Sequence, residues 1–129
     1  GAFVSGLDAG KIYQTWPTMG NTYFPNDLLL VQLDDFLRLD SHSLVQFYHR
    51  NLAYLLTIYV LLLTIYIYKK KLSYLYNPLK ILLFVLFLQI IFGIFTLISG
   101  LNIYLASFHQ ITSVLLVFSA LNLYYFRAN

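Results

Sequence analysis

The stretch NLAYLLTIYVLLLTIYIY, residues 51–68, runs for eighteen residues without a charged side chain. As an α-helix it would rise about 1.5 Å per residue and reach roughly 27 Å, close to the thickness of the hydrocarbon core of a bilayer. Apolar residues extend the pattern back to about Leu44, and Lys69, Lys70 and Lys71 stop it. The stretch therefore predicts a transmembrane helix over residues 44–68.

Two further apolar runs follow, and they predict transmembrane helices over residues 79–98 and 106–126. Pro78 is suited to the first turn of the second helix, because that turn needs no N–H donor there. Gly100 is suited to a left-handed cap at its end. Arg127 closes the third helix. The chain is therefore expected to be an all-α, polytopic transmembrane helix bundle.

The composition agrees with a membrane protein and excludes several other classes. Hydrophobic residues make up 60% of the chain and charged residues 10%, against about a quarter charged in a soluble domain. Because there is no cysteine, disulfides, thiolate metal sites and iron–sulfur clusters are excluded. The net charge of +3 comes mainly from lysines at the ends of apolar runs, so we expect contact with membrane lipid and no nucleic-acid partner.

Residues 8–43 form a long polar connection that contains all five aspartates. Within it, DLLLVQLDDFLRL (27–39) has apolar residues at helical spacing and predicts a short amphipathic helix at the membrane surface. Residues 1–7, GAFVSGL, read as the end of a transmembrane helix that begins upstream, so we expect the chain to be part of a longer protein.

The charges predict an orientation in the membrane. Five basic residues lie on one side if the three helices alternate in direction: Lys69, Lys70, Lys71, Lys80 and Arg127. The aspartates lie on the other side. The positive-inside rule places the basic side in the cytoplasm or mitochondrial matrix, so the long loop faces the periplasm or the intermembrane space.

Two histidines begin parallel helices. His49 lies near the start of the first predicted helix and His109 near the start of the third, so both are expected at one depth near the loop side. Two neutral imidazoles on facing helices can hold one heme iron between them. Each can also be an interfacial anchor, and the residues alone leave both readings open. Zinc fits less well, because two histidines are too few for a typical site. His42 is placed in the loop as a solvated residue.

Three other polar or small residues accompany these histidines. Arg50 follows His49 and can hold a heme propionate at the membrane surface or extend to the interface as an anchor. Gln89 and Gly93 lie one helical turn apart on the second helix, so they share a face. Gly93 permits close approach of another helix or a porphyrin, and Gln89 requires a hydrogen-bond partner. Ordinary helix packing explains this pair equally well.

Four motifs occur in an order that is familiar from one protein family: GLDAGKIYQTWPTMG (6–20), LVQFYHRNLAY (44–54), LQIIFGIFTLISG (88–100) and LASFHQITSVLLV (105–117). Together they resemble the C-terminal half of heme A synthase, the membrane enzyme that makes heme A for cytochrome oxidase. The resemblance covers nearly the whole chain.

The resemblance implies a fold, a cofactor and a reaction. The family has eight transmembrane helices in two similar four-helix bundles, so this chain would span the end of the fifth helix through the eighth. His49 and His109 match the axial ligands of a heme, usually heme B, in the C-terminal bundle. The family converts a methyl group of heme O to a formyl group by oxygen-dependent hydroxylation, with electrons from a redox partner. Its essential acidic residue lies in the other half, so the catalytic residues of this chain are unknown.

We therefore expect the heme-binding C-terminal half of a heme A synthase-like protein, in the mitochondrial inner membrane or, as the alternative, a bacterial plasma membrane. An N-terminal half or a partner chain would complete the bundle. A second expectation is an inactive relative retained as an accessory subunit of a respiratory-chain complex, with or without heme. A third is a small b-type cytochrome that only transfers electrons.

Overall fold

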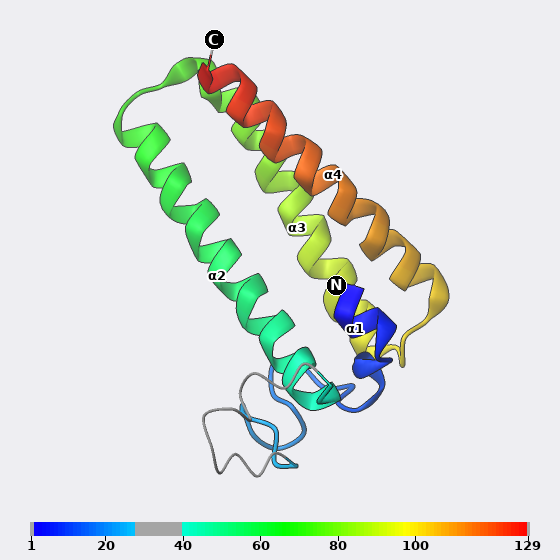
Figure 1. Ribbon diagram of the computed structural model, residues 1–129. Coiled ribbons are helices and arrows are strands. Elements are labelled where there is room, and N and C mark those ends of the chain that lie inside the picture. The colour runs from blue at the N-terminus through cyan, green and yellow to red at the C-terminus, as the bar shows by residue number, and fades with distance from the viewer. Residues whose placement is uncertain (1, 28–39, 129) are drawn as a thin grey trace.

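The chain is all-helical in the computed structural model, which describes residues 2–27 and 40–128 (Figure 1). A short helix, α1 (Ala2–Gly6), precedes a 3₁₀ turn, η1 (Ala9–Lys11). Three long helices then follow: α2 (His42–Lys69), α3 (Tyr76–Ile98) and α4 (Ile103–Ala128), with a 3₁₀ turn, η3 (Ser73–Leu75), before α3. The predicted fold class is confirmed, because three of these helices are long and apolar enough to cross a membrane.

Each long helix starts two or three residues before its predicted first residue, and at α2 and α4 a capping side chain sets the start. The Ser41 hydroxyl accepts a hydrogen bond from the N–H of Leu44 (3.5 Å), so α2 begins at His42. The prediction that His42 lies in the loop is thus wrong, although its side chain is exposed. In α4, the side chain of Asn102 accepts from the N–H of Tyr104 (3.0 Å) and caps the first turn.

Two predictions about the N-terminal part are not decided by the described residues. The amphipathic helix expected over residues 27–39 falls almost wholly on residues outside the described part of the chain. Residues 2–6 are helical in α1, as expected for the end of a helix, but the transmembrane helix to which they were assigned stays a prediction.

The end of α3 confirms the role predicted for Gly100. Its φ of 70° is in the left-handed region that favours glycine. The N–H of Gly100 donates to the carbonyl of Leu97 (3.3 Å), and the N–H of Leu101 donates to the carbonyl of Thr96 (2.9 Å). These two bonds form a Schellman motif, which satisfies the last carbonyls of the helix and turns the chain toward α4.

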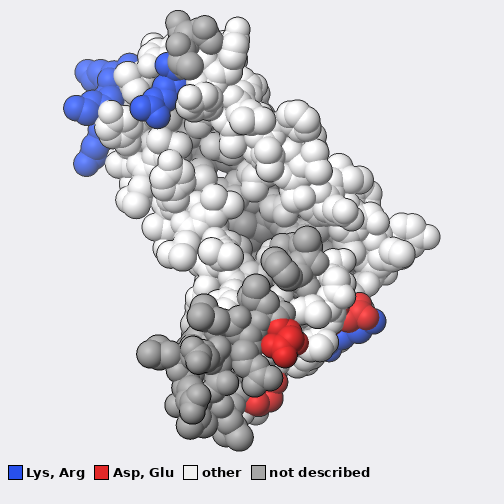
Figure 2. Space-filling view, viewed as in Figure 1, with Lys and Arg blue, Asp and Glu red and all other residues white. Residues whose placement is uncertain are grey.

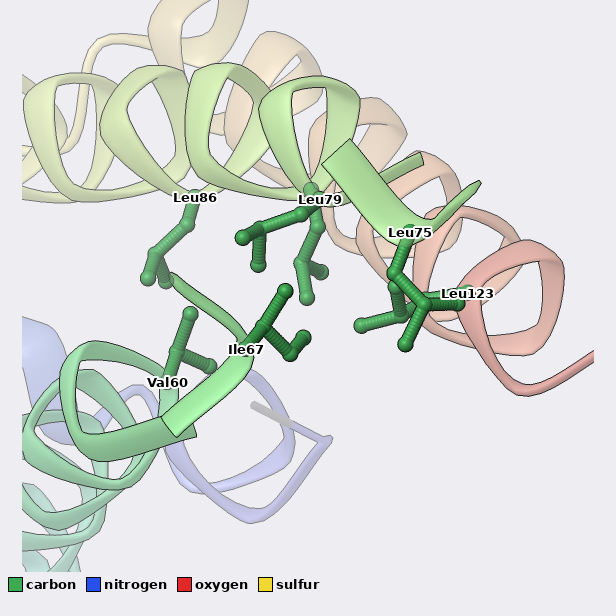
Figure 3. Packing of buried hydrophobic residues seen from close by; sticks show 7 residues of the cluster. Val60, Ile67, Leu75, Leu79, Leu86 and Leu123 are labelled. Carbon is green, nitrogen blue, oxygen red and sulfur yellow. The ribbon is translucent and has the colours of Figure 1, made fainter. Parts of the chain in front are cut away.

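The helices join most firmly at the lysine-bearing end of the molecule. There a cluster of buried side chains connects α2, α3 and α4 (Figure 3): Val60, Ile67, Leu75, Leu79, Leu82, Leu86 and Leu123. Helices α3 and α4 pack side by side along their length, whereas α2 lies to one side of this pair and contacts it much less (Figure 1). The start of α2, the end of α3 and the start of α4 therefore meet at the opposite end, where the two candidate histidines lie.

The charges separate along the helices as the sequence predicted. Figure 2 shows a group of Lys and Arg side chains at the end where α2 passes into α3, and Asp side chains at the other end. Lys11 lies beside Asp8 at the acidic end, where it forms an exposed ion pair of 2.8 Å.

Candidate functional site

The structure brings His49 of α2 and His109 of α4 together. Their ring centres lie 6.4 Å apart, and the ring planes are nearly perpendicular at 88°. Both side chains are half-buried. Because α2 and α4 run in the same direction from the same end of the molecule, residues near their starts reach one level (Figure 1). The sequence predicted that the two histidines lie at the same depth; the structure shows in addition that their imidazole rings are in contact.

The spacing of the two rings fits one metal ion between them. Two imidazoles on opposite sides of one ion would have ring centres roughly 6 Å apart, with metal–nitrogen bonds of about 2 Å and about 1 Å from each nitrogen to its ring centre. Among residues 2–27 and 40–128, no third histidine, cysteine or acid joins the pair in a group that could hold a metal ion. The pair therefore suits an ion whose other ligands come from elsewhere, as in a porphyrin, better than zinc.

The apolar side chains next to the two histidines in sequence make different contacts. Phe108 of α4, the residue before His109, stacks on Phe92 of α3 with ring centres 5.5 Å apart. Its ring therefore packs between α3 and α4. Phe47 packs instead against the loop aromatics Tyr23 and Phe24, at 5.7 Å and 5.2 Å. Leu52 is largely exposed. Of these side chains, the structure therefore gives Phe47 a loop-binding contact that the sequence did not suggest.

The ring of His109 contacts the face of α3 that carries Gln89 and Gly93. Its Nδ1 lies 3.1 Å from the backbone oxygen of Gln89, and its Nε2 lies 3.4 Å from the Gln89 side-chain nitrogen. The hydroxyl of Thr112, one turn after His109, donates to the Gln89 side-chain oxygen. The polar partner that Gln89 was expected to need is thus His109 together with Thr112. Sequence reasoning missed Thr112, although its spacing of three residues from His109 places both on one helix face.

Arg50 is directed to the loop that precedes α2, at residues 13–18. One terminal nitrogen, Nη1, donates to the carbonyls of Pro17 (3.4 Å) and Thr18 (3.1 Å), and Nη2 donates to the carbonyl of Tyr13 (3.1 Å). The side-chain nitrogen of Gln46 donates to the same Tyr13 carbonyl (2.8 Å). The Arg50 side chain therefore ties the loop to the helix that carries His49, a role that sequence reasoning did not foresee.

Further polar contacts fasten residues 13–27 to the first turns of α2. The Tyr23 hydroxyl donates to the side chain of Asn51. The carboxylate of Asp27 accepts from the hydroxyl of Ser43 and from that of Tyr13, the latter at 2.6 Å. Ser43 and Asn51 lie in the first turns of α2, which also carry Gln46 and Arg50. This concentration of polar side chains at the start of an apolar helix was the available signal that a polar segment docks there. The loop and the His49 helix thus form one structural unit.

The two hydroxyls hold Asp27 in its ionised form. Partial burial raises the pKa of Asp27, but the hydrogen bonds from Ser43 and Tyr13 outweigh burial, and the net effect lowers its pKa below the usual value. The same contact raises the pKa of Tyr13, because ionising its hydroxyl would remove the bond to Asp27. The ionised carboxylate is therefore the form that the docked loop stabilises.

Loop docking is expected to weaken in acid. Because the folded pKa of Asp27 is depressed, its contribution is complete above its unfolded value of about 4 and is lost as the pH falls through the folded value. Amide hydrogen-exchange protection of residues 13–27 should therefore drop below about pH 4. In Asp27→Asn, protection should already be lower at neutral pH and should lose this step.

Asp8→Asn is the matched control, because Asp8 pairs only with the exposed Lys11 and such pairs contribute little. An Asp27→Asn variant whose protection factors follow those of the native protein at every pH would contradict this role.

Comparison with known proteins places the sequence and the site in context. A family model described as COX15-CtaA, cytochrome oxidase assembly protein, matches residues 1–121. The chain is 40% identical to heme A synthase of Pelagibacter ubique (strain HTCC1062) over 131 aligned residues, covering 100% of this chain and 38% of that protein. It is 39% identical to heme A synthase of Wolbachia pipientis wMel, covering 94% of this chain and 33% of that protein.

A eukaryotic relative is similar to the same extent. Heme A synthase COX15 of Saccharomyces cerevisiae is 36% identical over 135 aligned residues, covering 94% of this chain and 28% of the yeast protein. The chain spans about a third of the length of the curated relatives that it matches. No solved structure matches it.

Proposed function

Because the chain belongs to the COX15/CtaA family of cytochrome oxidase assembly proteins, we propose that it is the C-terminal heme-binding part of a heme A synthase. It would contribute to the conversion of heme O to heme A for cytochrome oxidase. Since it spans about a third of its relatives, we assign the oxidation to the complete protein, in which an N-terminal half or a partner chain completes the bundle.

The facing pair of His49 and His109 carries this proposal. Their ring centres are 6.4 Å apart, so the two imidazoles would be the residues that hold the iron of one heme. The two residues come from parallel helices that are otherwise joined by apolar packing. When bound, a heme with two nitrogen ligands stores and passes single electrons. The protein supplies the two ligands, the apolar surroundings and the outer loop that packs beside them.

We assign Arg50 to one heme propionate. Nη1 donates to two loop carbonyls and Nη2 to one, so the Nε hydrogen and the second Nη2 hydrogen are the donors left for a carboxylate. In the described part of the chain, this buried Nε has no hydrogen-bond partner. An unsatisfied buried donor is costly, and a carboxylate acceptor would remove that cost. In this proposal Arg50 joins the loop and the cofactor.

We place this integral membrane protein in the mitochondrial inner membrane, with a bacterial plasma membrane as the alternative. Three helices that can span a membrane support the membrane assignment. The basic end would face the matrix or cytoplasm, and the loop of residues 8–41 would face the intermembrane space or periplasm. The relatives described above come from both bacteria and yeast, which is compatible with either membrane.

The test uses the full-length protein that contains this chain. A reduced-minus-oxidised optical spectrum of the purified protein should show a low-spin b-type heme, and cells without the gene should lose heme A. Bound heme with normal heme A in those cells would contradict the synthase assignment and favour an electron-transfer cytochrome. A protein without heme would contradict the ligand assignment and favour the accessory-subunit expectation.

A further inference from the structure

We infer that Gln89 and Gly93 of α3 are positioning residues that prepare His109 as a ligand through its Nε2 atom. In this inference, which rests on the proposed function, the Gln89 backbone selects the tautomer, its side chain occupies Nε2 until iron binds, and Gly93 leaves room for the ring. Each step follows from a contact between α3 and α4.

The tautomer of His109 follows from the Gln89 carbonyl. A carbonyl oxygen can only accept, so the 3.1 Å contact requires that Nδ1 carries the hydrogen. A neutral imidazole has one ring N–H, and Nε2 therefore keeps a free lone pair. This is the arrangement of a metal-binding histidine whose second ring nitrogen donates to a backbone carbonyl. Because the acceptor is a backbone carbonyl of α3, this tautomer of His109 does not depend on any side chain.

The side chain of Gln89 faces the same lone pair. Its amide nitrogen lies 3.4 Å from Nε2 of His109, and an amide nitrogen is a donor that matches this acceptor. The Thr112 hydroxyl donates to the Gln89 side-chain oxygen, which directs the amide nitrogen toward the ring. The Nδ1 contact leaves Nε2 as an acceptor, and the Thr112 contact leaves the Gln89 amide nitrogen as the donor beside it. The two contacts therefore assign the hydrogens consistently. When Nε2 coordinates iron, it gives up this hydrogen bond.

Gly93 decides whether the ring can lie there at all. A Cβ atom added at Gly93 would come within 2.9 Å of Cε1 and 3.3 Å of Nδ1 of His109. Cε1 lies between the two ring nitrogens, so any larger side chain would displace both the Nδ1 bond and the direction of Nε2. The imidazole is confined by the α3 backbone, so it cannot simply rotate away while keeping the bond to Gln89.

The first experiment needs no heme. Nitrogen-15 NMR of the heme-depleted full-length protein should show His109 with Nδ1 protonated and Nε2 bare. Gln89→Leu should shift the Nε2 resonance and leave the tautomer unchanged, because the backbone carbonyl remains. A mixture of both tautomers would overturn the inference, and so would an Nε2 chemical shift that is the same in Gln89→Leu and the native protein. Either result counts whether or not the protein binds heme.

The second experiment uses ferric heme as the probe. Gly93→Ala should convert the low-spin spectrum to a high-spin one, and added imidazole should restore the low-spin form by replacing the displaced ligand. Gly6→Ala is the control, because a Cβ there meets nothing within 4 Å. Gln89→Leu should keep the low-spin spectrum and bind ferric heme at least as tightly as the native protein, because the lost side chain competes with iron for Nε2 and the backbone carbonyl still holds Nδ1.

Thr112→Val should act in the same direction as Gln89→Leu but less strongly, because it only releases the amide. Its control is Thr57→Val, which removes a hydroxyl that bonds only the carbonyl of Ala53 within α2 (2.8 Å). The inference is overturned if Gly93→Ala keeps a low-spin spectrum, or if Gln89→Leu weakens heme binding. If the native protein binds no heme, the proposed function fails, and the NMR result alone decides the inference.

Discussion

His109→Ala and His49→Ala are each expected to abolish the low-spin heme signal of the full-length protein. With ring centres 6.4 Å apart, the two imidazoles can share one iron, so neither can replace the other. Loss of one leaves an iron with a single protein ligand, which changes the spin state and weakens heme binding. The reduced-minus-oxidised spectrum and the heme content per protein should both fall, and added imidazole should partly restore the spectrum.

His42→Ala provides the matched control for these two variants. His42 is the third histidine of the chain and lies on the same helix as His49, seven residues earlier, but its side chain is exposed at the first turn. Its removal should leave the spectrum unchanged. A low-spin signal that survives in both His49→Ala and His109→Ala would refute the assignment of this pair.

Arg50→Ala is expected to release the outer loop from α2. The guanidinium donates to the carbonyls of Tyr13, Pro17 and Thr18, and hydrogen bonds from a charged donor contribute about 1.5–3 kcal/mol each in favourable settings. Because this group is partly exposed and Gln46 still holds Tyr13, we expect a total loss on the order of 3 kcal/mol, or roughly 100-fold more opening. Hydrogen exchange of residues 13–27 measures this opening directly.

Two further variants make the result specific. Arg50→Lys keeps the charge but replaces a planar fork by a single ammonium, so it should recover only part of the protection. Lys11→Ala removes a cation of the same loop region that forms an ion pair with the exposed Asp8, and it should leave protection unchanged. Equal protection in Arg50→Ala and the native protein would mean that the aromatic and Asp27 contacts hold the loop without Arg50.

Much of the fold can be read from the sequence, because membrane-spanning helices carry their own evidence. Apolar runs without charges predict α2, α3 and α4, since a helix satisfies its backbone groups internally in a bilayer. Gly100 marks the end of α3 for the equally local reason that its φ is left-handed. The starts were less accurate, because Ser41 and Asn102 cap their helices outside the apolar runs.

The candidate site was predicted in part. Matched depths of His49 and His109 follow from counting along parallel helices, and the shared face of Gln89 and Gly93 follows from the helical repeat. Arg50 was expected to face a cofactor or the interface, yet its terminal nitrogens hold loop carbonyls. Backbone carbonyls exist at every residue, so nothing in the sequence distinguishes the three that Arg50 binds.

What the sequence by itself determined is therefore the set of helices, their direction and the level of each histidine along them. These depend on residues that are close in the chain and on the period of the helix. Only the tertiary structure decided that the rings of His49 and His109 come into edge contact, and that the His109 ring lies against Gly93 and Gln89 of α3. The side chains of one helical turn point in all directions around the helix axis. Which of them meets a neighbouring helix depends on how the helices pack, and that is decided by the tertiary structure.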